Sequence, residues 1–141
     1  MSQVAPQVGI VLVSHSVRLA EGAADLAAQV GGGTVTVIAA GGTDDGGLGT
    51  SVAKVERAIG AAEAGAGVLV LPDLGSAVLT VRALLADLPE ANVTLADAPF
   101  VEGAVAATVT AAAGADLKAV AKAAEEAWHA SKLGDPTRVG G

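Results

Sequence analysis

The sequence contains no cysteine and almost no aromatic residues. Without a thiol it can form no disulfide framework, no thiolate metal site and no cysteine nucleophile. One Phe, one Trp and no Tyr leave no row of aromatic side chains on which the bases of a single strand could stack. Basic residues are also scarce, since eight Lys and Arg stand against fifteen Asp and Glu, and the net charge of −7 repels phosphate backbones. We therefore expect no nucleic-acid partner.

Long apolar runs are absent as well. The apolar segments are broken by glycine or charge and stay well short of the roughly 20 residues that a membrane-spanning helix needs. Residues 1–7 lack the charged start, apolar run and cleavage site of a secretory signal. The two histidines do not form a pair with metal-ligand spacing. We expect a cytoplasmic protein that contacts no membrane and binds no metal.

Small apolar residues are abundant. Hydrophobic residues make up 52% of the sequence and there are 19 glycines, so the core must consist mainly of Ala, Val, Leu and Gly. A chain of 141 residues is the size of one domain, which buries about two thirds of the surface that the unfolded chain exposes. We predict a single domain over residues 1–133 and a flexible C-terminal tail over residues 134–141.

Short apolar segments alternate with segments of helical periodicity. Strands are predicted at 9–13, 34–40, 68–71 and 92–96, and helices at 17–30, from about 51 to the glycines at 65–67, at 77–88, at 102–113 and from 116 onward. Successive β–α units favour a parallel sheet with right-handed crossovers. The sequence therefore predicts an open, mainly parallel, four-stranded α/β sheet of order 2-1-3-4 with helices on both faces.

Periodicity also predicts which helix faces are buried. The apolar stripe of the first helix is Leu19, Ala23, Leu26, Ala27 and Val30. The helix at 77–88, with few polar members, is predicted to be the most buried. On the last helix, the apolar face is Leu117, Val120, Ala124, Ala127 and Trp128.

The first strand runs into Ser14-His15-Ser16, directly before a helix. Ligands of open α/β sheets bind at the carboxyl ends of the strands. Ser16 is a suitable N-cap, and the free N–H groups that follow it can bind an anion. A histidine beside an anion site points to phosphoryl chemistry with His15 as nucleophile, whereas a lone histidine is otherwise a structural or surface residue.

The third strand runs into Asp73-Leu74-Gly75-Ser76, and the order 2-1-3-4 brings this loop opposite His15. An imidazole nucleophile needs one ring nitrogen to donate a hydrogen bond while the other presents its lone pair. Asp73 is the candidate acceptor; its alternative role is that of a turn residue. Ser76 is predicted to cap the next helix. Phosphate binding is predicted at Ser14, Ser16, Gly75 and Ser76, because two helix N-termini can neutralise phosphoryl oxygens without a basic clamp.

The glycine-rich segment from Gly41 to Thr50 is not a nucleotide loop. It lacks the Lys-Ser/Thr ending of a P-loop, and the first β–α turn has no GxGxxG. Asp44 and Asp45 could ligate a cation, although acidic turns are usually just solvated. Because this loop follows the strand next to His15, we predict that Thr43, Asp44 and Asp45 bind a partner.

Seven short segments occur in an order that is typical of one family. They are V-S-H-S (13–16), L-A-E-G (19–22), I-A-A-G with T-D-D and G-T (38–50), D-L-G-S-A (73–77), A-P-F-V-E-G (98–103), A-A-T-V (106–109) and G-A-D (114–116). Together they resemble the phosphotransferase subunits of phosphoenolpyruvate-dependent dihydroxyacetone kinases, the DhaM family. The first domain of that family is similar to the mannose-type IIA domain of the sugar phosphotransferase system. The resemblance extends from Gly9 to about Trp128.

The resemblance implies a phosphoryl relay. His15 would accept a phosphoryl group from the phosphocarrier protein HPr and pass it to ADP on the nucleotide-binding subunit of the kinase, which phosphorylates dihydroxyacetone. Asp73 would orient Nδ1 and leave Nε2 to attack, and Gly75 and Ser76 would contact the phosphate. The nucleotide and its Mg²⁺ would sit on the partner subunit, so this chain would hold no cofactor. HPr would come from elsewhere, and a homodimer is expected.

Three other functions stay open. A regulatory phospho-acceptor module would report phosphotransferase status to a transcription factor. A sugar-permease IIA domain would pass the phosphoryl group to a membrane-associated IIB partner. A ligand-binding α/β domain without chemistry would not need His15.

Overall fold

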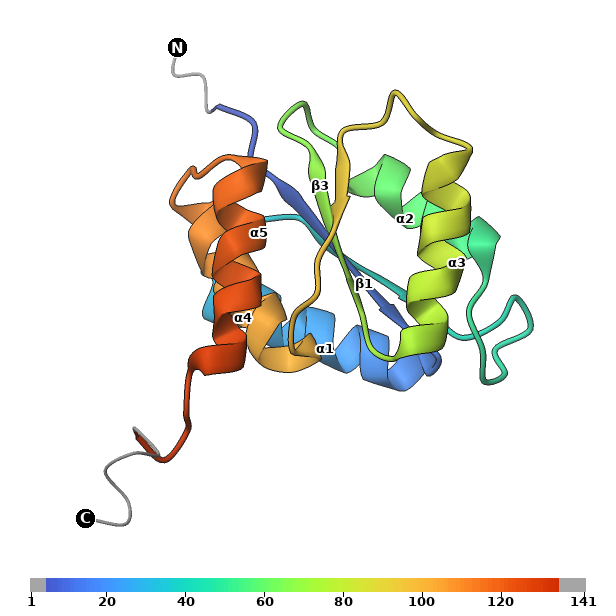
Figure 1. Ribbon diagram of the computed structural model, residues 1–141, viewed down its shortest axis with the longest axis horizontal. Coiled ribbons are helices and arrows are strands. Elements are labelled where there is room, and N and C mark those ends of the chain that lie inside the picture. The colour runs from blue at the N-terminus through green and yellow to red at the C-terminus, as the bar shows by residue number, and fades with distance from the viewer. Residues whose placement is uncertain (1–4, 135–141) are drawn as a thin grey trace.

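The computed structural model describes residues 5–134, in which four strands alternate with five α-helices (Figure 1). The elements are β1 (Gly9–Ser14), α1 (Val17–Val30), β2 (Val37–Gly41), α2 (Val52–Ala62), β3 (Val68–Pro72), α3 (Gly75–Ala86), β4 (Val93–Leu95), α4 (Phe100–Ala112) and α5 (Leu117–Glu126), followed by the short 3₁₀ helix η1 (Ala127–His129). The bounds of α1 match the prediction. The predicted tail at 134–141 lies outside the described residues, apart from Gly134.

The strands form one sheet in the order β2-β1-β3-β4, and every neighbouring pair is parallel. This confirms the predicted fold class and strand order. β1 is central and all six of its residues are buried, as expected of a strand covered on both faces. Since β1 pairs with both β2 and β3, Val13 lies between Ala40 and Pro72. The carboxyl ends of β1 and β3 are therefore neighbours.

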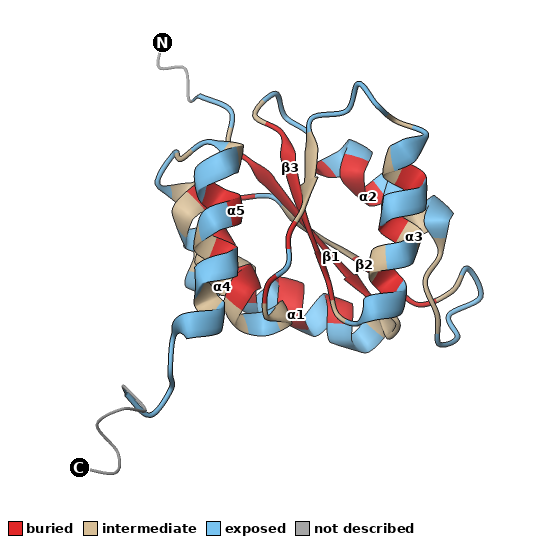
Figure 2. Ribbon diagram, in the orientation of Figure 1, coloured by how far each residue is buried: buried red, intermediate tan, exposed pale blue. Residues whose placement is uncertain are grey.

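Helices cover both faces of the sheet (Figure 2). On one face, α1, α4 and α5 pack on Ile10, Leu12, Leu69 and Leu71 through a layer made mostly of alanine. On the other face, α2 and α3 pack on Val11, Val13, Val68 and Val70. The two layers use alternate residues of the same strands, as the two-residue period of a strand requires.

The predicted inner face of α1 is wrong in part. Its buried residues are Ala20, Ala23, Ala24 and Ala27, whereas Leu19, Leu26 and Val30 are 45, 47 and 53% exposed. Periodicity weights Leu above Ala, but the alanine face allows the helix to lie close to the sheet. The larger side chains consequently remain at the surface.

The prediction that the third helix is the most buried is also wrong. In α3 only Ala77, Val81 and Leu84 are buried, whereas α4 buries Gly103, Ala104, Ala107, Thr108 and Ala111. The reason is position, because α4 packs against both α1 and α5 as well as the sheet. High apolar content did not indicate which helix has neighbours on several sides.

Gly9 is required where β1 meets the end of α2. A Cβ atom at this position would lie 2.1 Å from the carbonyl oxygen of Ala62, so Gly9→Ala must displace backbone. We expect this variant to lower the free energy of unfolding by about 2 kcal/mol or more in urea titrations. Gly60→Ala is the control, because the same test finds no neighbour within 4 Å of this helical glycine. It should gain roughly 0.5–1 kcal/mol, and equal stability of Gly9→Ala and wild type would contradict the packing argument.

Candidate functional site

His15 and Asp73 lie side by side at the carboxyl edge of the sheet. His15 directly follows β1, and Asp73 directly follows β3. The backbone N–H of Asp73 donates to the carbonyl oxygen of Val13 at 2.9 Å, which continues the β1–β3 ladder by one residue. Strand pairing therefore places the two side chains together.

The carboxylate of Asp73 accepts four hydrogen bonds. Its Oδ1 accepts from His15 Nδ1 at 3.0 Å and from the Leu74 N–H at 2.8 Å. Its Oδ2 accepts from the His15 N–H at 3.0 Å and from the Ser14 hydroxyl at 2.9 Å. The side chain of Asp73 is 9% exposed and that of His15 is 24% exposed. The aspartate is thus held rigidly, while the imidazole keeps access to solvent.

These contacts keep Asp73 ionised. Burial by itself raises the pKa of Asp73, but the hydrogen bonds from the His15 backbone, the His15 ring and Ser14 outweigh it, so the pKa lies below its ordinary value of 3.8. An ionised carboxylate can only accept, so Nδ1 of His15 carries the hydrogen in the Nδ1–Asp73 bond. The lone pair of a neutral ring is then on Nε2, which is the atom that would attack phosphorus.

Ser76 faces the other side of the imidazole. Its Oγ lies 2.5 Å from His15 Nε2, and with the hydrogen on Nδ1 it is the hydroxyl that donates. The prediction that Ser76 caps the third helix is wrong, because α3 begins at Gly75 with Leu74 as N-cap and no side-chain capping bond. The turn is tight because Asp73 Oδ1 accepts from the Leu74 N–H. Because Ser76 is not the N-cap, its Oγ is free to contact His15.

The predicted phosphate contact of Ser14 is wrong. The side chain is fully buried, and its hydroxyl donates to Asp73 Oδ2 and accepts from the Ser16 N–H at 3.0 Å. Ser14 therefore supports the aspartate from behind. Ser16 is the N-cap of α1, since its Oγ accepts from the Leu19 N–H at 3.2 Å. Phosphate contacts of Ser16, Gly75 and Ser76 stay predictions.

The glycine-rich loop borders the site. The Gly49 N–H donates to the carbonyl oxygen of His15 at 3.0 Å. Inside the loop, Asp45 accepts from the Thr43 hydroxyl and from the Gly47 N–H, and these two bonds, in that order, lower the pKa of Asp45. Asp44 accepts from the Ser51 hydroxyl at 2.5 Å. The predicted partner role of Thr43, Asp44 and Asp45 stays a prediction, but their side chains already hold the loop in shape.

Residues 5–134, which the structure describes, contain no group of three or more His, Cys, Asp or Glu side chains that could hold a metal ion. Within the same residues, no helix has the length and apolar character needed to cross a membrane.

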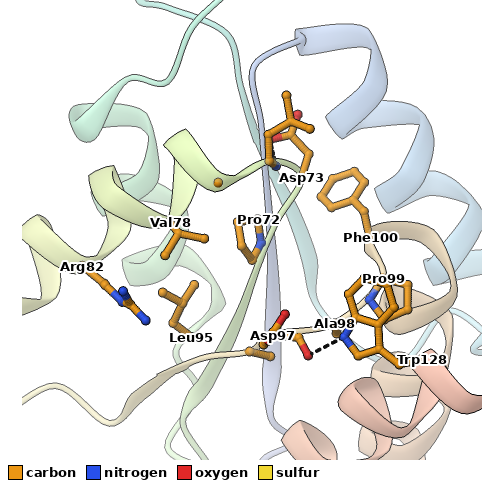
Figure 3. A pocket seen from close by; sticks show the side chains of 13 residues that line it. Pro72, Asp73, Val78, Arg82, Leu95, Asp97, Ala98, Pro99, Phe100 and Trp128 are labelled. Carbon is orange, nitrogen blue, oxygen red and sulfur yellow. Dashed lines mark hydrogen bonds between the residues drawn. The ribbon is translucent and has the colours of Figure 1, made fainter.

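A cavity of about 380 Å³ adjoins the His15 site (Figure 3). It shares Asp73, Leu74 and Gly75 with that site, and its other walls include Val78, Arg82, Leu95, Asp97, Phe100 and Trp128. This cavity was not predicted from the sequence. Trp128 was predicted to lie on the apolar face of the last helix, but it lies in η1 and is 59% exposed. The sequence signal for this cavity is the scarcity of aromatic residues, because the chain's one Phe and one Trp both line it.

The chain is similar to proteins of one described family. A family model described as PTS system fructose IIA component, EIIA-man, matches residues 9–121. The chain is 43% identical over 138 residues to the phosphoryl donor subunit DhaM of the PEP-dependent dihydroxyacetone kinase of Escherichia coli (strain K12). The match covers 92% of this chain but only 29% of that relative, so the chain spans less than a third of its length.

A shorter relative matches over most of its length. The phosphoryl donor subunit DhaM of PEP-dependent dihydroxyacetone kinase 2 of Listeria innocua is 38% identical over 106 residues, which is 72% of this chain and 84% of the relative. Among solved structures, the protein of unknown function EF1359 superposes with a TM-score of 0.77 at 35% identity, over 86% of this chain and 95% of that one. A sigma-54 interaction domain protein from Enterococcus faecalis, at 18% identity and a TM-score of 0.63, shares the fold alone.

Proposed function

Because the chain belongs to the EIIA-man family, the PTS system fructose IIA component, we propose that it carries a phosphoryl group on Nε2 of His15. The family match confirms the resemblance noted from the seven segments. The relatives named above are phosphoryl donor subunits of dihydroxyacetone kinases, and we assign this chain the same role. The observation that carries the proposal is the alignment of Asp73, the imidazole and Ser76, with Nδ1 tied to the carboxylate and Nε2 turned outward.

The reaction consists of two in-line transfers. In the first, the Nε2 lone pair of His15 attacks the phosphorus of the phosphorylated donor; the Nε2–P bond forms as the bond from phosphorus to the donor breaks, and its electron pair stays with the donor. In the second, an oxygen of the ADP β-phosphate attacks, and the Nε2–P electron pair returns to the ring. Both transition states are loose, so the site mainly has to position and to neutralise charge.

Each neighbour of His15 has a part in this relay. Asp73 stabilises the positive charge that the ring acquires when Nε2 bonds to phosphorus, because its carboxylate holds the Nδ1 hydrogen. The Ser76 hydroxyl leaves Nε2 and donates to a phosphoryl oxygen. The N–H groups of Gly75 and Ser76 belong to the first turn of α3, where no intrahelical acceptor uses them, and they face the same charge.

The proposal includes two partners, a donor and an acceptor. HPr donates, and the acceptor is ADP on the nucleotide-binding subunit of the kinase, which also holds the Mg²⁺. This chain needs no cofactor of its own and never contacts dihydroxyacetone. A homodimer and a cytoplasmic location complete the proposal.

Reconstitution tests the assignment. A complete reaction mixture should form dihydroxyacetone phosphate, and omission of this protein should stop the reaction. The mixture contains phosphoenolpyruvate, enzyme I, HPr, this protein, the ADP-bound kinase subunit and the subunit with bound dihydroxyacetone. If the protein is phosphorylated by HPr but no product forms, the kinase role is wrong. Transfer to a IIB protein would then indicate a sugar-permease domain, and the absence of such transfer a regulatory module.

The acidic loop offers a further test. We expect replacement of Asp44 and Asp45 by Ala to slow the relay roughly three- to tenfold at low partner concentration, because rim charges mainly affect the association rate. Asp87 and Glu90, exposed near the end of α3 at the opposite edge of the sheet, provide a control of the same charge when both become Ala. Stopped-flow transfer from phospho-HPr measures both variants. Equal rates for the loop variant and wild type would remove this loop from the partner surface.

A further inference from the structure

The cavity beside Asp73 extends the His15 site along the carboxyl edge of the sheet. Its walls come from three segments: the end of β3 with the following turn and α3, the stretch from the end of β4 to the start of α4, and η1 (Figure 3). Val78 and Arg82 on α3 form one side, and Phe100 and Trp128 form the other. Leu74, which directly follows Asp73 in the chain and lines the cavity, is 62% exposed.

Trp128 is exposed and yet fixed. Its indole Nε1–H donates to the carbonyl oxygen of Asp97 at 3.0 Å, and the side chain lies beside Pro99 (Figure 3). An indole held in one position loses little conformational freedom when a partner binds. Exposed Trp side chains of this kind are enriched among the residues that contribute most to protein–protein binding.

The charges of the cavity disfavour a phosphorylated metabolite. Asp73 and Asp97 supply two carboxylates against the single guanidinium of Arg82, so the lining carries a net negative charge. Most of the other lining residues are apolar. A volume of about 380 Å³ is at the small end of ligand cavities and is large enough for a bulky apolar side chain.

We propose that this cavity receives a bulky apolar side chain of the phosphoryl donor protein when the donor docks on His15. The inference rests on the proposed phosphocarrier function. We choose the phosphoryl donor as the partner for one reason. A kinase subunit, a permease domain and a regulatory module all need a protein that phosphorylates His15, whereas their acceptors differ. The continuity of the cavity with the Asp73–Gly75 turn places this contact next to the transferred group.

Two variants change the cavity in opposite ways. Trp128→Ala removes one wall, and Val78→Phe fills the space from the α3 side. Both should raise the KM for phospho-HPr about tenfold and leave the rate at saturating donor within about twofold, because the contact aids docking and does not touch the reacting atoms. Leu79→Ala is the matched control, since Leu79 is 69% exposed on the same helix but does not line the cavity. Its KM should equal that of wild type.

The outcomes separate the inference from the function on which it rests. If wild type accepts no phosphate from HPr, the proposed function fails. If wild type is phosphorylated and both cavity variants keep the wild-type KM, with native circular dichroism, the docking inference is wrong while the function stands. If the cavity variants raise only the KM for the ADP-bound kinase subunit, the docking inference is also wrong, and the cavity binds the acceptor and not the donor.

Direct occupancy can be observed at Trp128, the chain's single tryptophan. Protein labelled with 5-fluorotryptophan gives one ¹⁹F resonance, which should shift when unphosphorylated HPr is added. The Val78→Phe variant should require about tenfold more HPr for the same shift. A shift produced by phosphoenolpyruvate or dihydroxyacetone phosphate without HPr would instead identify a metabolite site and overturn the proposal.

Discussion

Replacement of His15 by Ala is expected to abolish phosphorylation completely. Incubation of wild type with phosphoenolpyruvate, enzyme I and HPr should add one acid-labile phosphate, which intact-mass analysis detects, and the variant should gain none. The loss is total because the variant has no other nucleophile in this place. Asp73 keeps three of its four donors, the Ser14 hydroxyl and the backbone N–H groups of residues 15 and 74, and the Ser76 hydroxyl has no base once the imidazole is removed.

The second histidine provides the control. His129 lies in η1 and makes no hydrogen bond with the Asp73 carboxylate that holds His15, so His129→Ala should still accept one phosphate. Phosphate on His15→Ala would assign the reaction to another residue. If neither variant accepts phosphate and wild type accepts none, the result would instead favour the ligand-binding domain without chemistry.

Substitution of Asp73 by Asn is expected to have the next largest effect. An amide can present its NH₂ group to Nδ1, which moves the ring hydrogen to Nε2 and removes the attacking lone pair. The variant also lacks the negative charge that stabilises the phosphorylated ring. Where an aspartate orients a catalytic histidine in this way, its loss costs on the order of 10³- to 10⁴-fold in rate.

Rapid-quench transfer from phospho-HPr would measure this loss. The expected change is in the rate at saturating donor, with the KM little altered, since Asp73 acts on the ring and lies beneath it. Asp25→Asn is the control, because Asp25 is exposed on α1 and makes no hydrogen bond with His15. If Asp73→Asn retains the wild-type rate, the orienting role is wrong.

The same variant should change the acid stability of the fold. Because the folded-state pKa of Asp73 lies below the unfolded value of 3.8, its contribution to stability is fully present above that value and is lost as the pH falls through the folded pKa. Urea unfolding of wild type should therefore weaken below about pH 4, and Asp73→Asn should lack this part of the acid dependence. Parallel pH profiles for the two proteins would contradict it.

Much of this architecture follows from local sequence. Runs of β-branched residues, glycine at the turns and helical periodicity give the order of the elements, and that order allows few parallel arrangements. His15 and Asp73 were both predicted to end a strand, and the strand order placed those strands together. Two polar residues far apart in the sequence could thus be paired because strand pairing is repetitive and its rules are general.

Tertiary structure decided which side chains meet. The alanine face of α1 and the burial of α4 depend on neighbours that periodicity does not include. Ser14 turned out to be a buried support for Asp73. Ser76 is a partner of Nε2 because α3 begins two residues earlier than predicted, which moves Ser76 from the N-cap into the first turn. The cavity lined by Phe100 and Trp128 forms only where three distant segments converge. Local sequence determines the elements, and the contacts between them determine the chemistry of the site.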